Sequence, residues 1–156
     1  MSRSMRAGAS AADSAALDLC IDAARRTCRA SLRRKPSAER APRGAAARTR
    51  RGEIFEAPEL AWVAGVGGSA EQVAVWRARL ASRSPITHVV VRGGKTGRSD
   101  GGPPNAATLQ VLLELAPRAL LYWGTDRTPR GGVRAAALLP GAFSPAHLDG
   151  SRGKPA

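Results

Sequence analysis

The stretch that most constrains the fold of this chain runs from Ile86 to Val91 and leads directly into the glycine-rich basic segment Arg92–Asp100. A run dominated by β-branched residues is typical of a buried strand. Glycines let a backbone approach an anion closely, and neighbouring cations such as Lys95 and Arg98 neutralise its charge. The sequence therefore predicts a strand that ends at a phosphate-binding loop.

Helical and strand-like patterns alternate on both sides of this run. We expect strands over 60–66, 86–91 and 119–123, helices over 69–82 and 105–115, and either state over 132–139. Strands that alternate with helices indicate a parallel sheet covered by helices. The predicted fold class is α/β, a small Rossmann-like three-layer domain with a mainly parallel sheet, preceded by an amphipathic helix and a disordered basic arm.

The N-terminal third carries most of the charge. The chain has a formal net charge of +13, and residues 1–52 hold 13 Lys and Arg against 4 Asp and Glu. Apolar residues recur at helical spacing over 10–35, whereas 36–52 read as a disordered linker. We therefore divide the chain into a basic arm (1–52), an α/β domain (53–140) and a flexible tail (141–156).

Such an arm attracts polyanions without selecting one, so nucleic acid and acidic proteins are both candidate partners. A solvated tail without a partner is an equal alternative. The candidate nucleic-acid contacts are Arg25, Arg26, Arg29, Arg33, Arg34, Lys35, Arg48, Arg50 and Arg51.

The two cysteines, Cys20 and Cys28, are eight residues apart on one predicted helix, which is too far for a disulfide within a straight helix. Neither belongs to a CxxC pair and no histidine is near, so we expect no metal site. The absence of a long apolar run or a secretory signal predicts an intracellular protein without a membrane span, cytoplasmic or, in a eukaryote or virus, nuclear.

A second glycine-rich turn, Gly65–Ala70, follows the first predicted strand and fits G-x-G-x-x-A, with Ser69 as a helix N-cap. Arg92 stands where an acidic ribose ligand is usual, and an arginine there suits a 2′-phosphate. The loop at Arg92 is not a Walker A motif, because Val89 replaces its first glycine. The candidate ligand-binding residues are Gly65, Gly67, Gly68, Ser69, Arg92, Gly93, Gly94, Lys95, Thr96, Gly97 and Arg98.

The segment Pro85–Gly97 resembles the second strand and glycine loop of the SLOG superfamily, Rossmann-like nucleotide-binding proteins that include DprA-type and LOG-type members. The segment Asn105–Gly132 is similar to the later helix, strand and second glycine-rich turn of that superfamily. The resemblance implies that Gly93, Gly94 and Gly97 are nucleotide-loop glycines. It implies no catalytic residue.

These observations favour a module that binds a nucleotide or phosphorylated ligand through both glycine loops. One alternative is a nonenzymatic nucleic-acid-binding or adaptor protein that acts through its arginines, and another is a weakly structured product of a GC-rich reading frame. The sequence leaves open whether the protein is an enzyme. His88 and His147 are expected in structural roles, and Trp62, Trp76 and Trp123 in the core.

Overall fold

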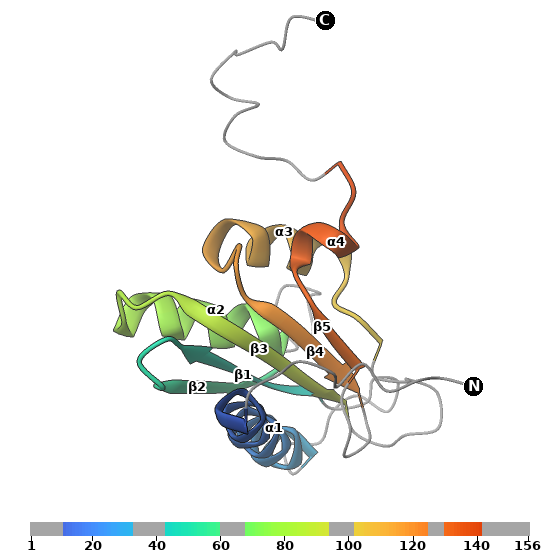
Figure 1. Cartoon of the computed structure of the whole chain (residues 1–156). Helices are drawn as coiled ribbons and strands as arrows, with labels where there is room; N and C mark the ends of the chain where they lie inside the picture. Colours follow the sequence, from blue (N-terminus) through green and yellow to red (C-terminus); the bar gives the residue numbers. More distant parts are fainter. Residues whose placement is uncertain (1–10, 33–42, 60–67, 94–101, 125–129, 142–156) are drawn as a thin grey trace, which may run out of the picture.

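The computed structural model describes residues 11–32, 43–59, 68–93, 102–124 and 130–141. Four helices and five strands follow one another along these residues (Figure 1). Their order is α1 (Ala11–Leu32), β1 (Arg43–Thr49), β2 (Ile54–Pro58), α2 (Ala70–Ala81), β3 (Ile86–Gly93), α3 (Ala106–Leu115), β4 (Leu120–Gly124), β5 (Arg130–Val133) and α4 (Ala135–Leu138).

The five strands form one sheet in the order β2-β1-β3-β4-β5. Only β3 and β4 are parallel, and the other three pairs are antiparallel. The prediction of an α/β domain is confirmed, but the prediction of a mainly parallel, Rossmann-like sheet is wrong. The error arises at β1 and β2, which form an antiparallel hairpin before the single β3-α3-β4 crossover.

Strand β1 is an inner strand, paired on both sides with β2 and β3, although its residues fall in the segment 36–52 that is predicted to be a disordered linker. Alanine has low strand propensity and arginine is usually exposed, so Arg43–Thr49 carries no strand pattern. The small side chains instead suit a central strand that is covered on both faces. Ala45, Ala46 and Ala47 are all fully buried between the helices on the two sides.

Helices cover both faces of the sheet and enclose two separate cores (Figure 1). Helices α2, α3 and α4 lie on one face, where Val75, Val89 and Leu112 belong to the larger core. Helix α1 lies on the other face, where Ile21 packs with Val90 in the smaller core. The described elements therefore form three layers, and α1, which was predicted to precede the domain, is one of them.

The contact between α1 and β1 depends on Gly44. A Cβ atom at this position would collide with the backbone of Ala24 and Cys28 and with the Thr27 hydroxyl. Helix α1 therefore approaches the strand more closely than any other residue would allow. An ion pair of 3.1 Å between Arg26 and Glu56 joins the same helix to β2.

The local predictions largely hold where the structure describes them. The helices predicted at 10–35, 69–82 and 105–115 correspond to α1, α2 and α3, and the strands at 86–91 and 119–123 to β3 and β4. Segment 132–139 contains the end of β5 and all of α4. The strand predicted at 60–66 lies outside the described residues.

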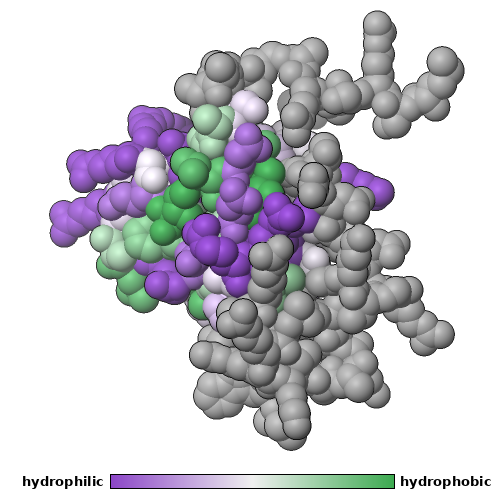
Figure 2. All heavy atoms as spheres, turned by 90° about the horizontal axis from the view of Figure 1, so that it is seen from below, coloured by the Kyte–Doolittle hydropathy of each residue, from purple (hydrophilic) through white to green (hydrophobic). Residues whose placement is uncertain are grey.

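Figure 2 views the molecule from the side of α1 and shows hydrophobic and hydrophilic side chains intermixed on that face. Leu19 on α1 is a large apolar residue that is 58% exposed. Within the described ranges, none of the helices combines the length and the apolar character that a membrane span requires.

Candidate functional site

The N-terminal ends of α2 and α3 meet beside the sheet, and each is capped by a polar side chain. Ser69 caps α2, accepting a hydrogen bond from the Gln72 amide, and the Gln72 side chain accepts one from the Ser69 amide in return. Asn105 caps α3 through a 2.9 Å hydrogen bond from the Thr108 amide to its Oδ1. Both helices thus begin where their sequences provide a cap.

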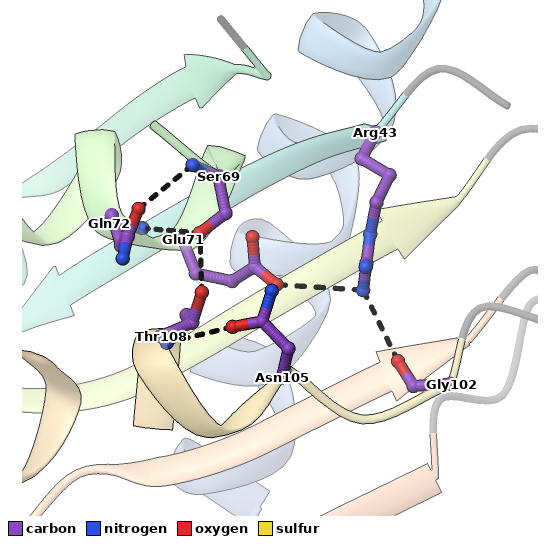
Figure 3. Close-up of polar contacts among 7 residues, drawn as sticks. All are labelled: Arg43, Ser69, Glu71, Gln72, Gly102, Asn105 and Thr108. Carbon is purple, nitrogen blue, oxygen red and sulfur yellow. Dashed lines mark hydrogen bonds and ion pairs between the residues drawn. The ribbon is translucent and has the colours of Figure 1, made fainter. Parts of the chain in front are cut away.

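The two caps are joined to each other. The buried Thr108 hydroxyl donates a 3.1 Å hydrogen bond to Ser69 Oγ, across 39 residues of sequence. Asn105 and Thr108 lie three residues apart and therefore share one face of the first turn of α3. Figure 3 shows Ser69, Asn105 and Thr108 grouped around one point between the helices.

Glu71 lies in the first turn of α2 and is directed into this group (Figure 3). Its side chain is only 1% exposed, and Oε1 lies 3.5 Å from Arg43 Nη2 at the start of β1. Neither carboxylate oxygen has a hydrogen-bond partner among the described residues. The Arg43 guanidinium also donates to the Gly102 carbonyl at 3.2 Å, just before α3.

Such a carboxylate is unusual, because burial of a charge is costly unless hydrogen bonds replace those it made with water. Arg43 balances the charge, but both oxygens keep acceptor capacity directed at the helix ends. An N–H or O–H donor on a small ligand would meet that need. The backbone amides of two helix N-termini provide a positive potential around the same point.

The arrangement has a definite chemical repertoire. The Glu71 carboxylate accepts hydrogen bonds and can take up or release a proton. The Arg43 guanidinium and the Asn105 carboxamide are donors for a carbonyl oxygen. Together these groups suit a neutral ring that presents an amino group beside a carbonyl.

The structure places the predicted ligand-binding residues in different surroundings. Ser69 belongs to the group just described, and Gly68 precedes it. Arg92 is 4% exposed and shares the α1 face of β3 with Val90, whereas Ser69 lies on the opposite side of the sheet. Gly93 ends β3, and the remaining predicted residues, Gly65, Gly67, Gly94, Lys95, Thr96, Gly97 and Arg98, lie outside the described residues.

The predicted nucleic-acid contacts are also dispersed. Arg25 pairs with Asp22, and Arg26 pairs with Glu56 on β2. Arg48 lies in β1, and Arg50 and Arg51 occupy the exposed turn that follows. Arg29 belongs to α1, while Arg33, Arg34 and Lys35 fall outside the described ranges.

Comparison with known proteins identifies the fold. No protein-family profile and no curated protein matches the chain. Among solved structures, the cytidine deaminase from Burkholderia pseudomallei is similar with a TM-score of 0.66 and 25% identity, covering 80% of this chain and 97% of its own. The cytidine deaminase from Mycobacterium tuberculosis is similar with a TM-score of 0.63 and 21% identity, covering 82% of this chain and 97% of its own.

A third cytidine deaminase, from Mycobacterium leprae, gives a TM-score of 0.60 and 19% identity, covering 80% of this chain and 97% of its own. These neighbours correct the resemblance to the SLOG superfamily, which rested on one strand and its glycine loop. They also overturn two functions predicted from the sequence, a Rossmann-like nucleotide-binding module and a nonenzymatic adaptor that acts through its arginines. The topology explains why, since an antiparallel hairpin precedes the one parallel pair.

The expectation of no metal is corrected by the same finding. Cytidine deaminases use a zinc-bound water, with a His or Cys two residues before a glutamate and a later Pro-Cys-x-x-Cys segment. The two cysteines of the chain, Cys20 and Cys28, both belong to α1 and lie on the other face of the sheet. Burial raises the pKa of the Cys20 thiol to about 11. A matching spacing in this chain lies elsewhere, at the N-termini of α2 and α3.

The residues now at that position do not fit zinc. The same spacing occurs in this chain as Ser69-Ala70-Glu71 and Pro104-Asn105-Ala106-Ala107-Thr108, with Ser69, Asn105 and Thr108 at the places where the signature has its His or Cys ligands. Zinc takes thiolate, imidazole or carboxylate donors, whereas two hydroxyls and a carboxamide are neutral oxygen ligands. In the part of the chain that the structure describes, no three His, Cys, Asp or Glu side chains are grouped to hold a metal.

Sequence reasoning missed Glu71, Arg43, Asn105 and Thr108. The signal available was spacing alone: a glutamate two residues after Ser69 and a proline before Asn105-x-x-Thr108. A search for cysteine and histidine cannot find a signature from which both are missing. The described part of the chain therefore has the fold of the cytidine deaminases.

Proposed function

We propose that this chain recognises a nucleoside with a cytosine-type amino edge at the N-terminal ends of α2 and α3. The observation that carries the proposal is the buried Glu71 carboxylate, whose two oxygens lack a hydrogen-bond partner among the described residues. The ligand is recognised through its base, not through phosphate. This site shares Ser69 with the Gly65–Ala70 turn and does not include the loop at Arg92.

The chemistry of the base favours cytosine over uracil. Cytosine presents an amino group beside the ring nitrogen N3, and a carboxylate can accept hydrogen bonds from that amino group. Uracil presents one N–H between two carbonyl oxygens, and these would face the negative Glu71. A hydrogen bond from a neutral donor to a charged acceptor contributes about 1.5–3 kcal/mol, which corresponds to roughly tenfold or more in affinity.

Support for a nucleoside also comes from the fold, because the similar solved structures are cytidine deaminases over nearly their whole length. The proposal concerns recognition of the nucleoside. Deamination in that class uses a zinc-bound water, and the donors at Ser69, Asn105 and Thr108 do not fit zinc.

Isothermal titration of the full chain with cytidine and with uridine tests the proposal. We expect cytidine to bind more tightly than uridine, and Glu71→Gln to weaken cytidine binding about tenfold or more by removing the charged acceptor. Glu114→Gln is the matched control, since Glu114 is exposed on α3 and accepts from Gln110 at 2.9 Å.

Three results would count against the proposal. These are no binding of cytidine at millimolar concentration, equal affinity for uridine, and equal losses in Glu71→Gln and Glu114→Gln. If the wild type converts cytidine to uridine and Glu71→Gln does not, the conclusion that the side chains of Ser69, Asn105 and Thr108 do not fit zinc would be contradicted.

A further inference from the structure

We infer that Ser69, Asn105 and Thr108 occupy the three ligand positions of a zinc site, where they instead cap α3 and link it to α2 through the Thr108–Ser69 hydrogen bond, so that three cysteines there would complete a zinc site beside Glu71. This inference is independent of nucleoside binding. It concerns what these three positions can hold.

The first argument is convergence. The hydroxyl oxygens of Ser69 and Thr108 are 3.1 Å apart, although they come from different helices. Three sulfurs bound to one tetrahedral zinc, each at about 2.3 Å, lie roughly 3.8 Å from one another. The longer C–S bond and a small rotamer change account for a difference of this size.

The second argument is the backbone around the positions. Ser69 and Asn105 are N-caps, and Thr108 is in the first turn of α3, so helix amides surround all three. A helix N-terminus lowers the pKa of a cysteine and favours the thiolate that binds metal. The Asn105 and Thr108 positions have the i, i+3 spacing of a C-x-x-C pair, which is a frequent zinc-ligand spacing.

The third argument is charge. A zinc ion beside Glu71 would face its carboxylate with a positive charge, and in this chain the Arg43 guanidinium does so at 3.5 Å. Arg43 also donates to the Gly102 carbonyl and so ties the start of β1 to the segment before α3. The side chains thus replace both roles of an ion: they link the two helices and balance the carboxylate.

The test is cobalt binding to the full chain carrying Ser69→Cys, Asn105→Cys and Thr108→Cys. Cobalt(II) reports on a zinc site through ligand-field bands of tetrahedral coordination and thiolate-to-metal charge transfer. We expect one equivalent of cobalt to bind with both signatures, and one equivalent of zinc to displace it. The wild type should show neither signature.

A matched control carries Arg79→Cys, Ala107→Cys and Glu114→Cys, three exposed positions on the same two helices that do not converge. It has the same number of added thiols and should not give the tetrahedral spectrum. Circular dichroism establishes that both triple variants are folded. If the first triple variant does not fold, the double variant Asn105→Cys with Thr108→Cys is compared with Ala107→Cys with Glu114→Cys, and the first pair should bind cobalt more tightly.

Two results would overturn the inference. One is a folded triple variant, or a folded double variant Asn105→Cys with Thr108→Cys, that binds no more cobalt than its control. The other is a wild-type chain that retains an equivalent of zinc, lost on Ser69→Ala with Asn105→Ala. Because neither readout involves a nucleoside, failure here is distinguishable from failure of the proposed function.

Discussion

Individual residues decide how closely the layers of this protein approach one another, and Gly44 is the clearest case. Gly44→Ala would place a methyl group against the backbone of α1. Overpacking of this kind costs about 1–3 kcal/mol, so we expect a clear fall in the midpoint of chemical unfolding. Gly102→Ala is the control, since a Cβ there meets nothing within 4 Å and should change stability by no more than about 0.5 kcal/mol. Equal effects would show that α1 does not pack as described.

Glu53 is a second residue whose surroundings predict a measurable effect. Its carboxylate accepts hydrogen bonds from the hydroxyls of Ser82 at 2.6 Å and Thr49 at 2.9 Å, and these bonds lower the pKa of Glu53 below its ordinary 4.5. A carboxyl whose pKa is lower in the folded state stabilises the protein above the unfolded pKa. That contribution is lost as the pH falls through the folded pKa.

We therefore expect Glu53→Gln to lower the thermal midpoint near neutral pH, and the gap from the wild type to shrink as the pH falls below 4.5. Thermal unfolding monitored by circular dichroism at several pH values measures it. The control is again Glu114→Gln on the surface of α3. A gap that stays constant from neutral pH to well below 4.5 would refute this account of Glu53.

At the scale of elements, the structure gives α1 a different role from the one expected. The N-terminal helix was grouped with a basic arm, yet Ile21 is 5% exposed and packs in a core with Ala46 and Val90. Ile21→Asp would leave an unpaired charge in that core and should cost about 3 kcal/mol or more. Leu19→Asp changes an exposed position on the same helix and should cost about 0.5 kcal/mol or less. Equal unfolding midpoints for the two variants would show that α1 does not pack on the sheet and is part of the basic arm.

For the molecule as a whole, the sequence predicts those helices and strands that have a regular apolar spacing or a capping residue. Strand β3 can be predicted from its run of apolar residues. Helices α2 and α3 can be predicted because their apolar residues have helical spacing and because Ser69 and Asn105 are typical N-caps. Strand β1 could not be predicted, because a segment of alanine and arginine has the composition of a linker. Its small side chains are accounted for only by the helices that cover both faces of the sheet. Strand β5 could not be predicted either, because its sequence Arg-Gly-Gly-Val has no strand pattern.

The site could not be predicted from residue types, for a related reason. Its chemistry depends on Glu71 from α2, Arg43 from β1 and Thr108 from α3, which only the folded sheet brings together. The glycine loop after Val91 has the composition of a phosphate site, and it led the sequence interpretation toward phosphate. The informative feature was the spacing of Glu71 and Pro104 relative to the caps.

The central claim is that the helix N-termini around Glu71 form the ligand site, and nuclear magnetic resonance of the isotope-labelled full chain tests it most directly. On titration with cytidine, the account predicts that the largest amide shifts fall in residues 69–72 and 105–108. Shifts confined to other parts of the chain, or no shifts at millimolar cytidine, would contradict it.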